Sequence, residues 1–341
     1  MSLFDQREKR VVSLQHVAVI IATRNEAEHL EDCIQSLLKA AKSSAQVLFI
    51  DDQSTDQSLN ILNRYVPKIK VIHGYGKGPS HARNLALQYT DRSWIAFTDG
   101  DCRVDENWLD VLCEGINQCP QNVFSIGGMQ KISPKAQKME RLVGEFLECV
   151  GFVSDYLHHK SEIHAVKHNP TCNVLYSRQA LEAVNGFDET LWPCEDLDLD
   201  LRLQKLGYHA LFQPKAIVEH RRPKTFLLFL KMMKRYGFGH AHLVKKHGHC
   251  QKLHWLPILF AFVGIGWLLF QVQFASTVMF PLTEVVLLLF FLALALFFCV
   301  KSRSLTKAIV FPFFWTASVF SWLVGYYQGS LTKTKVASPH E

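Results

Sequence analysis

The 341-residue sequence lacks the short glycine-rich motifs of two large classes of nucleotide-binding protein. No G-x-G-x-x-G follows the first apolar run, which argues against a dinucleotide-binding fold, and no G-x-x-x-x-G-K-[ST] is present, which excludes a P-loop protein. Its nine cysteines show no C-x-x-C spacing, so we expect free thiols rather than a zinc or disulfide framework. The N-terminus has no apolar signal-peptide core, so we expect nothing there that exports the following domain.

The N-terminal third alternates apolar runs with amphipathic segments. Strands are predicted at residues 16–23, 46–50, 70–73 and 94–99. A helix is predicted after each of the first three strands. Asn25 with Glu28, and Ser54 with Gln57, have the spacing of capping boxes that begin the first two helices. This alternation predicts an α/β domain with a mostly parallel sheet and helices on both faces.

Each predicted strand is followed by polar residues, and in a parallel sheet these strand ends meet at one edge. These residues are Thr23, Arg24 and Glu26 after the first strand, Asp51 and Asp52 after the second, Lys77 in the glycine-rich loop after the third, and Asp99 and Asp101 after the fourth. We expect Gly100 to let the backbone turn so that the carboxylates of Asp99 and Asp101 reach one cation. Such a pair suits Mg²⁺ or Mn²⁺. An Asp-Gly turn without a metal is the plainer alternative.

Seven motifs occur in order between Val17 and about Gly248. They are A-T-R-N-E (22–26), I-D-D-Q-S-T-D (50–56), G-P-S-H-A-R-N (78–84), D-G-D (99–101), N-P-T-C-N-V-L-Y-S-R (169–178), G-F-D-E (186–189) and C-E-D-L-D-L-D-L-R (194–202). Together they resemble family 2 glycosyltransferases with the GT-A fold, and among these the membrane-anchored, succinoglycan-type transferases of cell-surface or exopolysaccharide biosynthesis. The resemblance implies inverting, metal-dependent transfer of a single sugar from a nucleotide-sugar donor to a lipid-linked saccharide.

The resemblance also implies roles for individual residues. Thr23, Arg24, Glu26, Asp52, Lys77, Arg83 and Asp99 would bind the nucleotide sugar. Asp99, Asp101 and His220 would hold the divalent cation, with a plain surface histidine as the alternative for His220. Asp196, with Glu195 beside it, would take the proton of the acceptor hydroxyl.

The segment that carries Glu195 and Asp196 has an ambiguous pattern. Its alternation, L-D-L-D-L-R-L, is typical of a half-buried strand. Acidic residues at its start and Gly207 after its end favour a helix from about Glu195 to Leu206 instead. We therefore predict a helix, and an acidic helix N-terminus without a catalytic role is the alternative.

From Leu253 onward the sequence is almost free of charge for long stretches. Residues 253–274, 279–300 and 308–327 are each long enough to cross a bilayer, which needs roughly 20 apolar residues. Lysines and arginines cluster before the first segment and between the second and third, so the positive-inside rule predicts a cytoplasmic catalytic domain and multi-pass anchoring in the inner or plasma membrane. A re-entrant third segment is the alternative, because a full span would place Lys333 and Lys335 outside. The predicted organisation is a GT-A domain at 1–250, a membrane domain of two to three helices at 251–330, and a tail at 331–341.

The net charge of +6 is concentrated before the apolar segments, which favours anionic lipid over nucleic acid as a partner. In the same region we expect the pairs His240/His242 and His247/His249 to lie on a solvated face, with a zinc site as the alternative. Two other enzyme classes stay open. A polyprenyl-phosphate monosaccharide synthase would need little base assistance, which the Glu195-Asp196 pair disfavours. A Mg-dependent aspartyl phosphatase would normally carry its two aspartates after the first strand, not the fourth.

Overall fold

A computed structural model describes most of the chain. The described residues are 11–151, 162–249, 251–255, 257–259, 261–263, 265–266 and 279–332, without the side chains of 279–284 and 287. The chain forms two compact units, one of Met1–Ala136, Val153–Arg222 and Val336–Glu341, the other of Gln137–Phe152 and Pro223–Lys335. The boundary near Arg222 lies before the apolar segments begin, so the first unit holds all seven motifs of the sequence.

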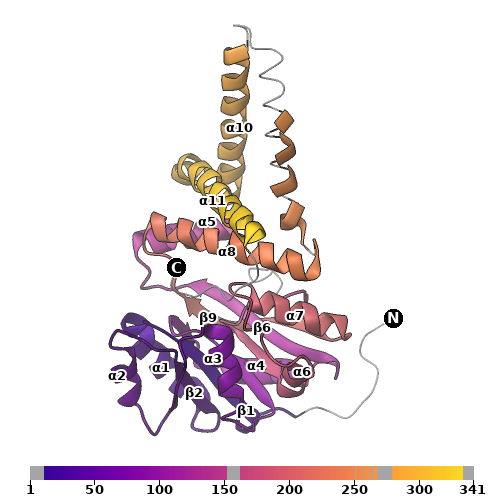
Figure 1. The fold of residues 1–341 in the computed structure, drawn as a ribbon. Helices are drawn as coiled ribbons and strands as arrows, with labels where there is room; N and C mark the ends of the chain where they lie inside the picture. Colours follow the sequence, from indigo (N-terminus) through magenta and orange to yellow (C-terminus); the bar gives the residue numbers. More distant parts are fainter. Residues whose placement is uncertain are drawn as a thin grey trace. The chain divides into compact units, whose positions relative to one another are not determined.

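The first unit is built on a nine-stranded sheet in the order β3-β2-β1-β4-β8-β6-β9-β5, with β7 beside β9 (Figure 1). The strands are β1 Val17–Thr23, β2 Gln46–Asp51, β3 Lys70–His73, β4 Trp94–Phe97, β5 Cys102–Val104, β6 Val123–Ile132, β7 His164–Val166, β8 Val174–Ser177 and β9 His209–His220. The strands β3, β2, β1 and β4 are parallel, as predicted. Beyond β4 the sheet is mixed, because β8 runs antiparallel to β4 and β6, and β5 and β7 run antiparallel to β9.

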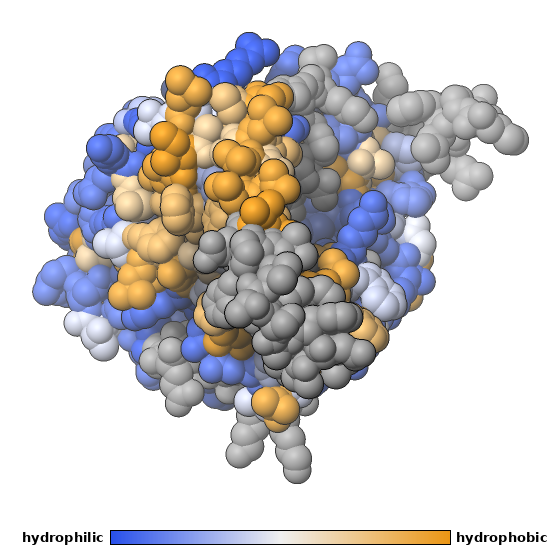
Figure 2. Space-filling view, turned by 90° about the horizontal axis from the view of Figure 1, so that it is seen from above, coloured by the Kyte–Doolittle hydropathy of each residue, from blue (hydrophilic) through white to orange (hydrophobic). Residues whose placement is uncertain are grey.

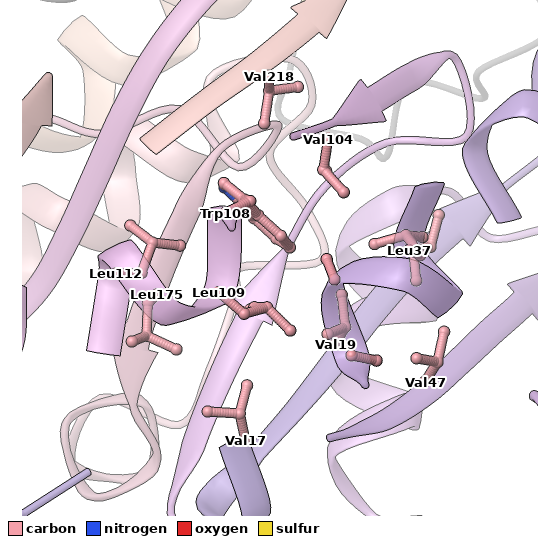
Figure 3. Close-up of a cluster of buried hydrophobic side chains, with 14 of the residues drawn as sticks. Val17, Val19, Leu37, Val47, Val104, Trp108, Leu109, Leu112, Leu175 and Val218 are labelled. Atoms are coloured by element: carbon pink, nitrogen blue, oxygen red, sulfur yellow. The ribbon is translucent and has the colours of Figure 1, made fainter. Parts of the chain in front are cut away.

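Helices cover both faces of this sheet. They are α1 Ala27–Ala41, α2 Ser58–Asn63, α3 Pro79–Leu87, α4 Trp108–Asn117, α6 Arg178–Ala183 and α7 Glu195–Lys205, after a short 3-10 turn, η1 Leu14–His16. Successive side chains of β1 point to opposite faces, so Val19 joins Leu37 of α1 and Trp108 of α4 in one apolar cluster (Figure 3). Ile20 joins Leu199 of α7 in the other cluster. The predicted α/β layers are thus confirmed.

The predicted capping boxes are wrong. The helix α1 begins at Ala27 and α2 at Ser58, and neither start has a side-chain cap hydrogen bond. The backbone N–H of Asn25 instead donates to Ser54 Oγ at 3.0 Å, and that of Ala27 donates to Asp56 Oδ2 at 3.1 Å. Polar side chains that suit a cap also bond other loops, and spacing along the sequence cannot distinguish the two uses. These bonds fasten the A-T-R-N-E segment to the I-D-D-Q-S-T-D segment.

The second unit is helical within the described residues. Its elements are α5 Lys138–Cys149, α8 Phe226–His247, a short 3-10 turn η3 Lys252–Trp255, α10 Met279–Ser302 and α11 Leu305–Leu331. In α8, His240 and His242 are buried, and His240 Nδ1 lies 2.9 Å from His254 Nε2. The predicted solvated face is therefore wrong for these two histidines, because the ring of His240 packs against Trp322 of α11 and His242 Nε2 lies 3.4 Å from Thr332 Oγ1. His249 is exposed, as predicted.

One helix among the described residues is long and apolar enough to cross a membrane, α11. Residues Leu288–Ser302 of α10 form a shorter apolar helix, and the first predicted span, 253–274, lies largely outside the described residues. On α10 several apolar side chains at helical spacing are more than half exposed: Val286, Leu289, Leu292, Leu296 and Val300. Figure 2 shows hydrophobic side chains gathered on one face of the molecule. Multi-pass anchoring stays a prediction.

Glycines bring α8 and α11 into backbone contact. A Cβ added at Gly237 of α8 would collide with the carbonyl oxygen of Trp322, and one at Gly325 of α11 with that of Lys234. A Cβ at Gly329 would lie 2.7 Å from the carbonyl oxygen of Phe238. Gly325 and Gly329 form a G-x-x-x-G pattern, which lets helices approach closely without relying on the hydrophobic effect.

We expect Gly325→Ala to destabilise the helical unit by about 1–3 kcal/mol, the usual cost of overpacking, because the new methyl group meets main chain that cannot rotate away. Thermal unfolding of the detergent-solubilised protein measures this effect. Gly266→Ala is the matched control, since a Cβ there meets nothing within 4 Å. Equal melting temperatures for the two variants would contradict the close contact.

Candidate active site

The loop after β4 and the end of β9 bring three of the predicted site residues together. Because β5 pairs with β9, Cys102 lies opposite His220 in the sheet, and Asp101 precedes Cys102. Asp101 Oδ2 lies 3.5 Å from His220 Nε2. One potential ligand atom from each of Asp99, Asp101, Cys102 and His220 lies within 4.8 Å of the others. Ligand atoms so close together could surround a single ion.

The orientation of His220 suits metal binding. Its Nδ1 lies 3.2 Å from the side-chain oxygen of Gln130, an acceptor, so Nδ1 carries the hydrogen and Nε2 faces Asp101. A ligating histidine usually donates its second ring N–H to an oxygen in this way. Two carboxylates and one imidazole match the oxygen and nitrogen ligands of Mn²⁺, and the carboxylates match Mg²⁺. The residues therefore fit the predicted divalent cation.

In the absence of metal, two groups of this cluster hold their protons to a higher pH than usual. Burial alone would lower the pKa of His220, but the Asp101 carboxylate and Cys172 outweigh it and raise that pKa to about 10. Burial raises the pKa of the Cys102 thiol well above its usual range, and a thiol is a poor ligand until it loses its proton. A cation would displace the extra proton of His220, and hard ions such as Mg²⁺ and Mn²⁺ prefer oxygen and imidazole ligands to a thiol, so Asp99, Asp101 and His220 stay the candidate ligands.

The backbone turns at Gly100, as predicted, and the N–H of Cys102 donates to the carbonyl of Asp99 at 3.1 Å, but this turn does not need a left-handed conformation. The φ of Gly100 is not among the positive values of the chain. A Cβ at this position would instead lie 2.9 Å from Thr23 Cγ2 and 3.2 Å from Glu26 Cγ. The glycine is needed because the D-G-D loop packs closely against the A-T-R-N-E loop.

Glu26 lies in the electrostatic field of the two aspartates. Burial, followed by Asp101 and Asp99, raises its pKa from 4.5 to about 8. The folded protein without metal therefore keeps a proton that the unfolded chain loses above about pH 4.5. The stability contributed by this proton is complete below that pH and is lost as pH rises towards 8.

We expect Glu26→Gln to flatten this pH dependence in chelator-treated protein, because the amide keeps the shape of the protonated acid but cannot ionise. Melting temperatures measured between pH 5 and 8 should fall less for the variant than for the wild type. Glu114→Gln, at an exposed position of α4, is the control and should follow the wild type. Parallel curves for Glu26→Gln and the wild type would contradict the buried, protonated state.

Arg83 of α3 connects two parts of the site. Its Nη1 donates to Glu195 Oε1 at 2.7 Å and its Nη2 donates to Asp99 Oδ1 at 3.1 Å. Arg83 and Glu195 are both buried, and removing one partner of a buried ion pair leaves the other charge unpaired. The guanidinium thereby joins the loop after β4 to the start of α7. Burial, followed by Asp196, raises the pKa of Glu195 to about 7 despite Arg83.

The helix α7 begins at Glu195, as predicted, and not as a strand. Its first turn contains Glu195, Asp196 and Asp198, which the positive end of the helix dipole favours. Cys194, just before it, has a left-handed φ of 84°, which costs energy for a residue with a side chain. Asp196 is partly exposed, and its Oδ1 accepts the N–H of Leu197 at 2.8 Å.

The predicted donor-binding residues lie around the loops after β1, β2 and β3. Both carboxylate oxygens of Asp52 are used inside the protein, accepting the N–H groups of Gly76 at 2.7 Å and Gly78 at 2.8 Å. Thr23 Oγ1 donates to the carbonyl of Ile50. Lys77 is exposed. Asp52 therefore shapes the glycine-rich loop as well as lying at the sheet edge.

Buried polar atoms without a partner among the described residues occur on Arg24 and Asp51, and also at His81 Nδ1 and Arg83 Nε of α3. Arg24 Nε and Nη1 and Asp51 Oδ1 are buried and have no hydrogen-bond partner among the residues that the structure describes. Buried polar groups are usually paired, so unpaired ones suggest a place for a polar ligand. This observation supports a donor-binding role for Arg24.

Several residues of the site were not predicted. Gln130 orients His220, and His168 lies 3.7 Å from Asp196. Asn84 binds both the N–H and the carbonyl of Phe187, which fixes the G-F-D-E loop. Asn173 accepts the indole N–H of Trp108 and donates to two strand carbonyls. Of these residues, only Asn84 and Asn173 could have been found from the sequence, because they belong to two of the seven motifs.

Comparisons with known proteins agree with this architecture. The model of the family "Glycosyl transferase family 2" matches residues 18–184. The sequence is 26% identical over 243 residues to the pre-mycofactocin glycosyltransferase of Mycobacterium tuberculosis, covering 69% of this chain and 49% of that protein. It is 28% identical over 275 residues to the succinoglycan biosynthesis protein ExoA of Rhizobium meliloti, covering 76% of this chain and 80% of that protein. The chain therefore spans about half the length of the first of these relatives.

Among solved structures, the mannosyltransferase PcManGT of Pyrobaculum calidifontis, in complex with GDP-Man and Mn²⁺, resembles the fold. The TM-score is 0.58 at 16% identity, covering 90% of this chain and 87% of that one. Residues 18–184 thus match a glycosyl transferase family 2 domain, and the first unit has the GT-A fold. This finding sets aside the aspartyl phosphatase alternative.

Proposed function

We propose that the protein transfers a single sugar from a nucleotide-sugar donor to a lipid-linked saccharide, with inversion and with a divalent cation. One observation carries the proposal. Arg83 ties Asp99, one of the candidate metal ligands, to Glu195, which precedes the candidate base Asp196. A donor diphosphate and an acceptor hydroxyl would then be held by one connected group of side chains, as a displacement reaction needs.

In this proposal Asp99, Asp101 and His220 hold Mg²⁺ or Mn²⁺. When bound, such a cation would supply positive charge that offsets the negative charge of the departing nucleoside diphosphate. Thr23, Arg24, Asp52 and Lys77 surround the nucleotide, and the unpaired guanidinium atoms of Arg24 support that placement. Mn²⁺ and GDP-mannose bound to PcManGT are consistent with a metal and a nucleotide sugar at such a fold.

Asp196 is proposed as the general base. As the acceptor oxygen attacks the anomeric carbon, its proton passes to the Asp196 carboxylate, and the electron pair of the broken C–O bond leaves with the nucleoside diphosphate. A single displacement of this kind inverts the anomeric centre. The exposed edge of Asp196 and its fixed place at the start of α7 support this role.

The test uses the purified full-length chain in detergent and a panel of nucleotide sugars. At least one donor should raise the melting temperature only when Mn²⁺ or Mg²⁺ is present, and the same donor should support transfer to lipid-linked saccharides. No stabilisation by any nucleotide sugar, with or without metal, would overturn the proposal. Transfer to polyprenyl phosphate alone would favour a polyprenyl-phosphate monosaccharide synthase instead.

We also propose a membrane location, with residues 1–250 in the cytoplasm and residues 251–330 as a multi-pass anchor in the inner or plasma membrane. The apolar helix α11 and the exposed apolar face of α10 support it. Reporters fused after Gly248, Ser276, Ser304 and the C-terminus should read cytoplasm, outside and cytoplasm at the first three positions. The C-terminal fusion should read outside for a full third span and cytoplasm for a re-entrant one. A cytoplasmic signal at Ser276 would contradict the multi-pass arrangement.

A further inference from the structure

We propose that His168 is a positioning residue that holds the carboxylate of Asp196 in place for proton transfer. This inference rests on the proposed function of Asp196 as the base. His168 lies between two carboxylates of α7: its Nδ1 is 2.8 Å from Asp200 Oδ2, and its Nε2 is 3.7 Å from Asp196 Oδ2. The imidazole therefore links a buried anchor to the partly exposed candidate base.

The spacing of the two acids makes this link possible. Asp196 and Asp200 are four residues apart on a helix, so their side chains lie on the same face, one turn apart. A ring placed beside that face can meet both carboxylates at once, one with each nitrogen. His168 comes from the segment just before the N-P-T-C-N motif, outside α7, so it holds the helix face from a separate part of the chain.

Asp200 is a rigid anchor for the ring. Its side chain is fully buried, and three donors surround it. Tyr176 donates its hydroxyl to Oδ1 at 2.7 Å, and the N–H of Asn169 donates to Oδ2 at 2.8 Å, the same oxygen that His168 Nδ1 approaches. A carboxylate held this firmly accepts from Nδ1–H and fixes the ring with Nε2 directed at Asp196. The ring attracts both carboxylates in its protonated form, which carries a hydrogen on each nitrogen.

The two oxygens of Asp196 are consequently not equivalent. Oδ1 accepts the N–H of Leu197 at 2.8 Å, while Oδ2 faces His168 Nε2 at a distance too long for a strong hydrogen bond. Oδ2 is thus oriented but still able to take a proton. We infer that the acceptor hydroxyl gives its proton to Oδ2, and that His168 keeps this oxygen in position without itself forming or breaking a bond.

Two substitutions of His168 separate its contact with Asp200 from its contact with Asp196. His168→Asn keeps an amide donor near the Nδ1 position, towards Asp200, but leaves nothing near Asp196. His168→Gln places its amide near the Nε2 position, towards Asp196. We expect His168→Asn to lower the single-turnover transfer rate about 10- to 100-fold, the size expected when a reacting group is misplaced by about 1 Å. Donor affinity and the KM for the acceptor should stay within about twofold, and His168→Gln should recover part of the rate.

The exposed His209 gives a matched control, and His209→Asn should behave as the wild type. A double variant tests whether His168 acts through Asp196. In the Asp196→Asn background, His168→Asn should cost nothing further, because there is no carboxylate left to position. If the two substitutions lower the transfer rate multiplicatively in the double variant, the inference is wrong. It is also wrong if both single variants of His168 keep the wild-type rate.

The outcomes also distinguish this inference from the proposed function. If Asp196→Asn transfers sugar at the normal rate, the base assignment fails, and the role of His168 fails with it. If Asp196→Asn is inactive while both His168 variants are fully active, only the role of His168 fails. Melting temperatures of all variants, compared with that of Tyr176→Phe, which removes one donor to Asp200 without touching the ring, show whether a lost rate reflects a lost fold.

Discussion

Asp101→Asn is expected to abolish metal-dependent donor binding while the protein stays folded. The substitution keeps the side-chain volume but replaces a charged oxygen that lies 3.5 Å from His220 Nε2, and a neutral amide is a much weaker ligand for a hard cation. Calorimetric titration with the donor, in the presence and absence of Mn²⁺, measures the effect. Wild-type protein should bind the donor tightly only with metal, and the variant should bind weakly in both conditions.

The exposed Asp105, four residues further along the chain, provides the control for this experiment. Asp105→Asn makes the same chemical change away from the candidate ligands and should leave donor binding as in the wild type. Undiminished, metal-dependent affinity in Asp101→Asn would mean that the cation is held elsewhere.

Asp196→Asn should have the largest effect on chemistry. We expect a loss of transfer by a factor of about 10²–10⁴, the usual contribution of a general base, with donor and metal affinity unchanged. The variant keeps an oxygen that can accept the N–H of Leu197, so the start of α7 should be preserved. Single-turnover transfer at saturating donor and acceptor separates this chemical effect from binding.

The variant Glu195→Gln, at the neighbouring position, tests which of the two acids is the base. Glu195 is buried and its pKa is raised to about 7, so a fraction of the molecules carry the neutral acid near neutral pH, and an amide resembles that form. We expect a milder loss, through the weakened contact with Arg83. An active Asp196→Asn with an inactive Glu195→Gln would exchange the two roles, and activity in both would place the base elsewhere.

The parts of the fold that depend on local sequence could be predicted. Four parallel strands and the helix that begins at Glu195 follow from apolar runs and from the charges at the helix ends. The second half of the sheet could not be predicted in this way, because the pairing of β6 with β9 joins strands far apart in the sequence and contains irregular register. Helix starts were misplaced where polar side chains bond a neighbouring loop.

The residues of the site also divide into those that local sequence predicts and those that it does not. Asp99 and Asp101 follow a strand and suggested a metal from sequence alone. His220 joins them only through the pairing of β5 with β9, and the family resemblance supplied what the spacing could not. Gln130 and His168 act through contacts with side chains distant in sequence, and neither lies in a recognisable pattern. Such residues become visible only when the tertiary structure is known.

The two contacts of Arg83 also bear on the order in which the donor, the cation and the acceptor bind. Glu26, Asp99 and Asp101 influence one another electrostatically, and Arg83 is already shared between Asp99 and Glu195. Without a cation, a nucleoside diphosphate would meet the carboxylates of Asp99 and Asp101 directly, and like charges repel one another. We therefore expect donor and cation to enter as one complex, before the acceptor, so that a cell's supply of free divalent metal sets how much of the enzyme is ready to react.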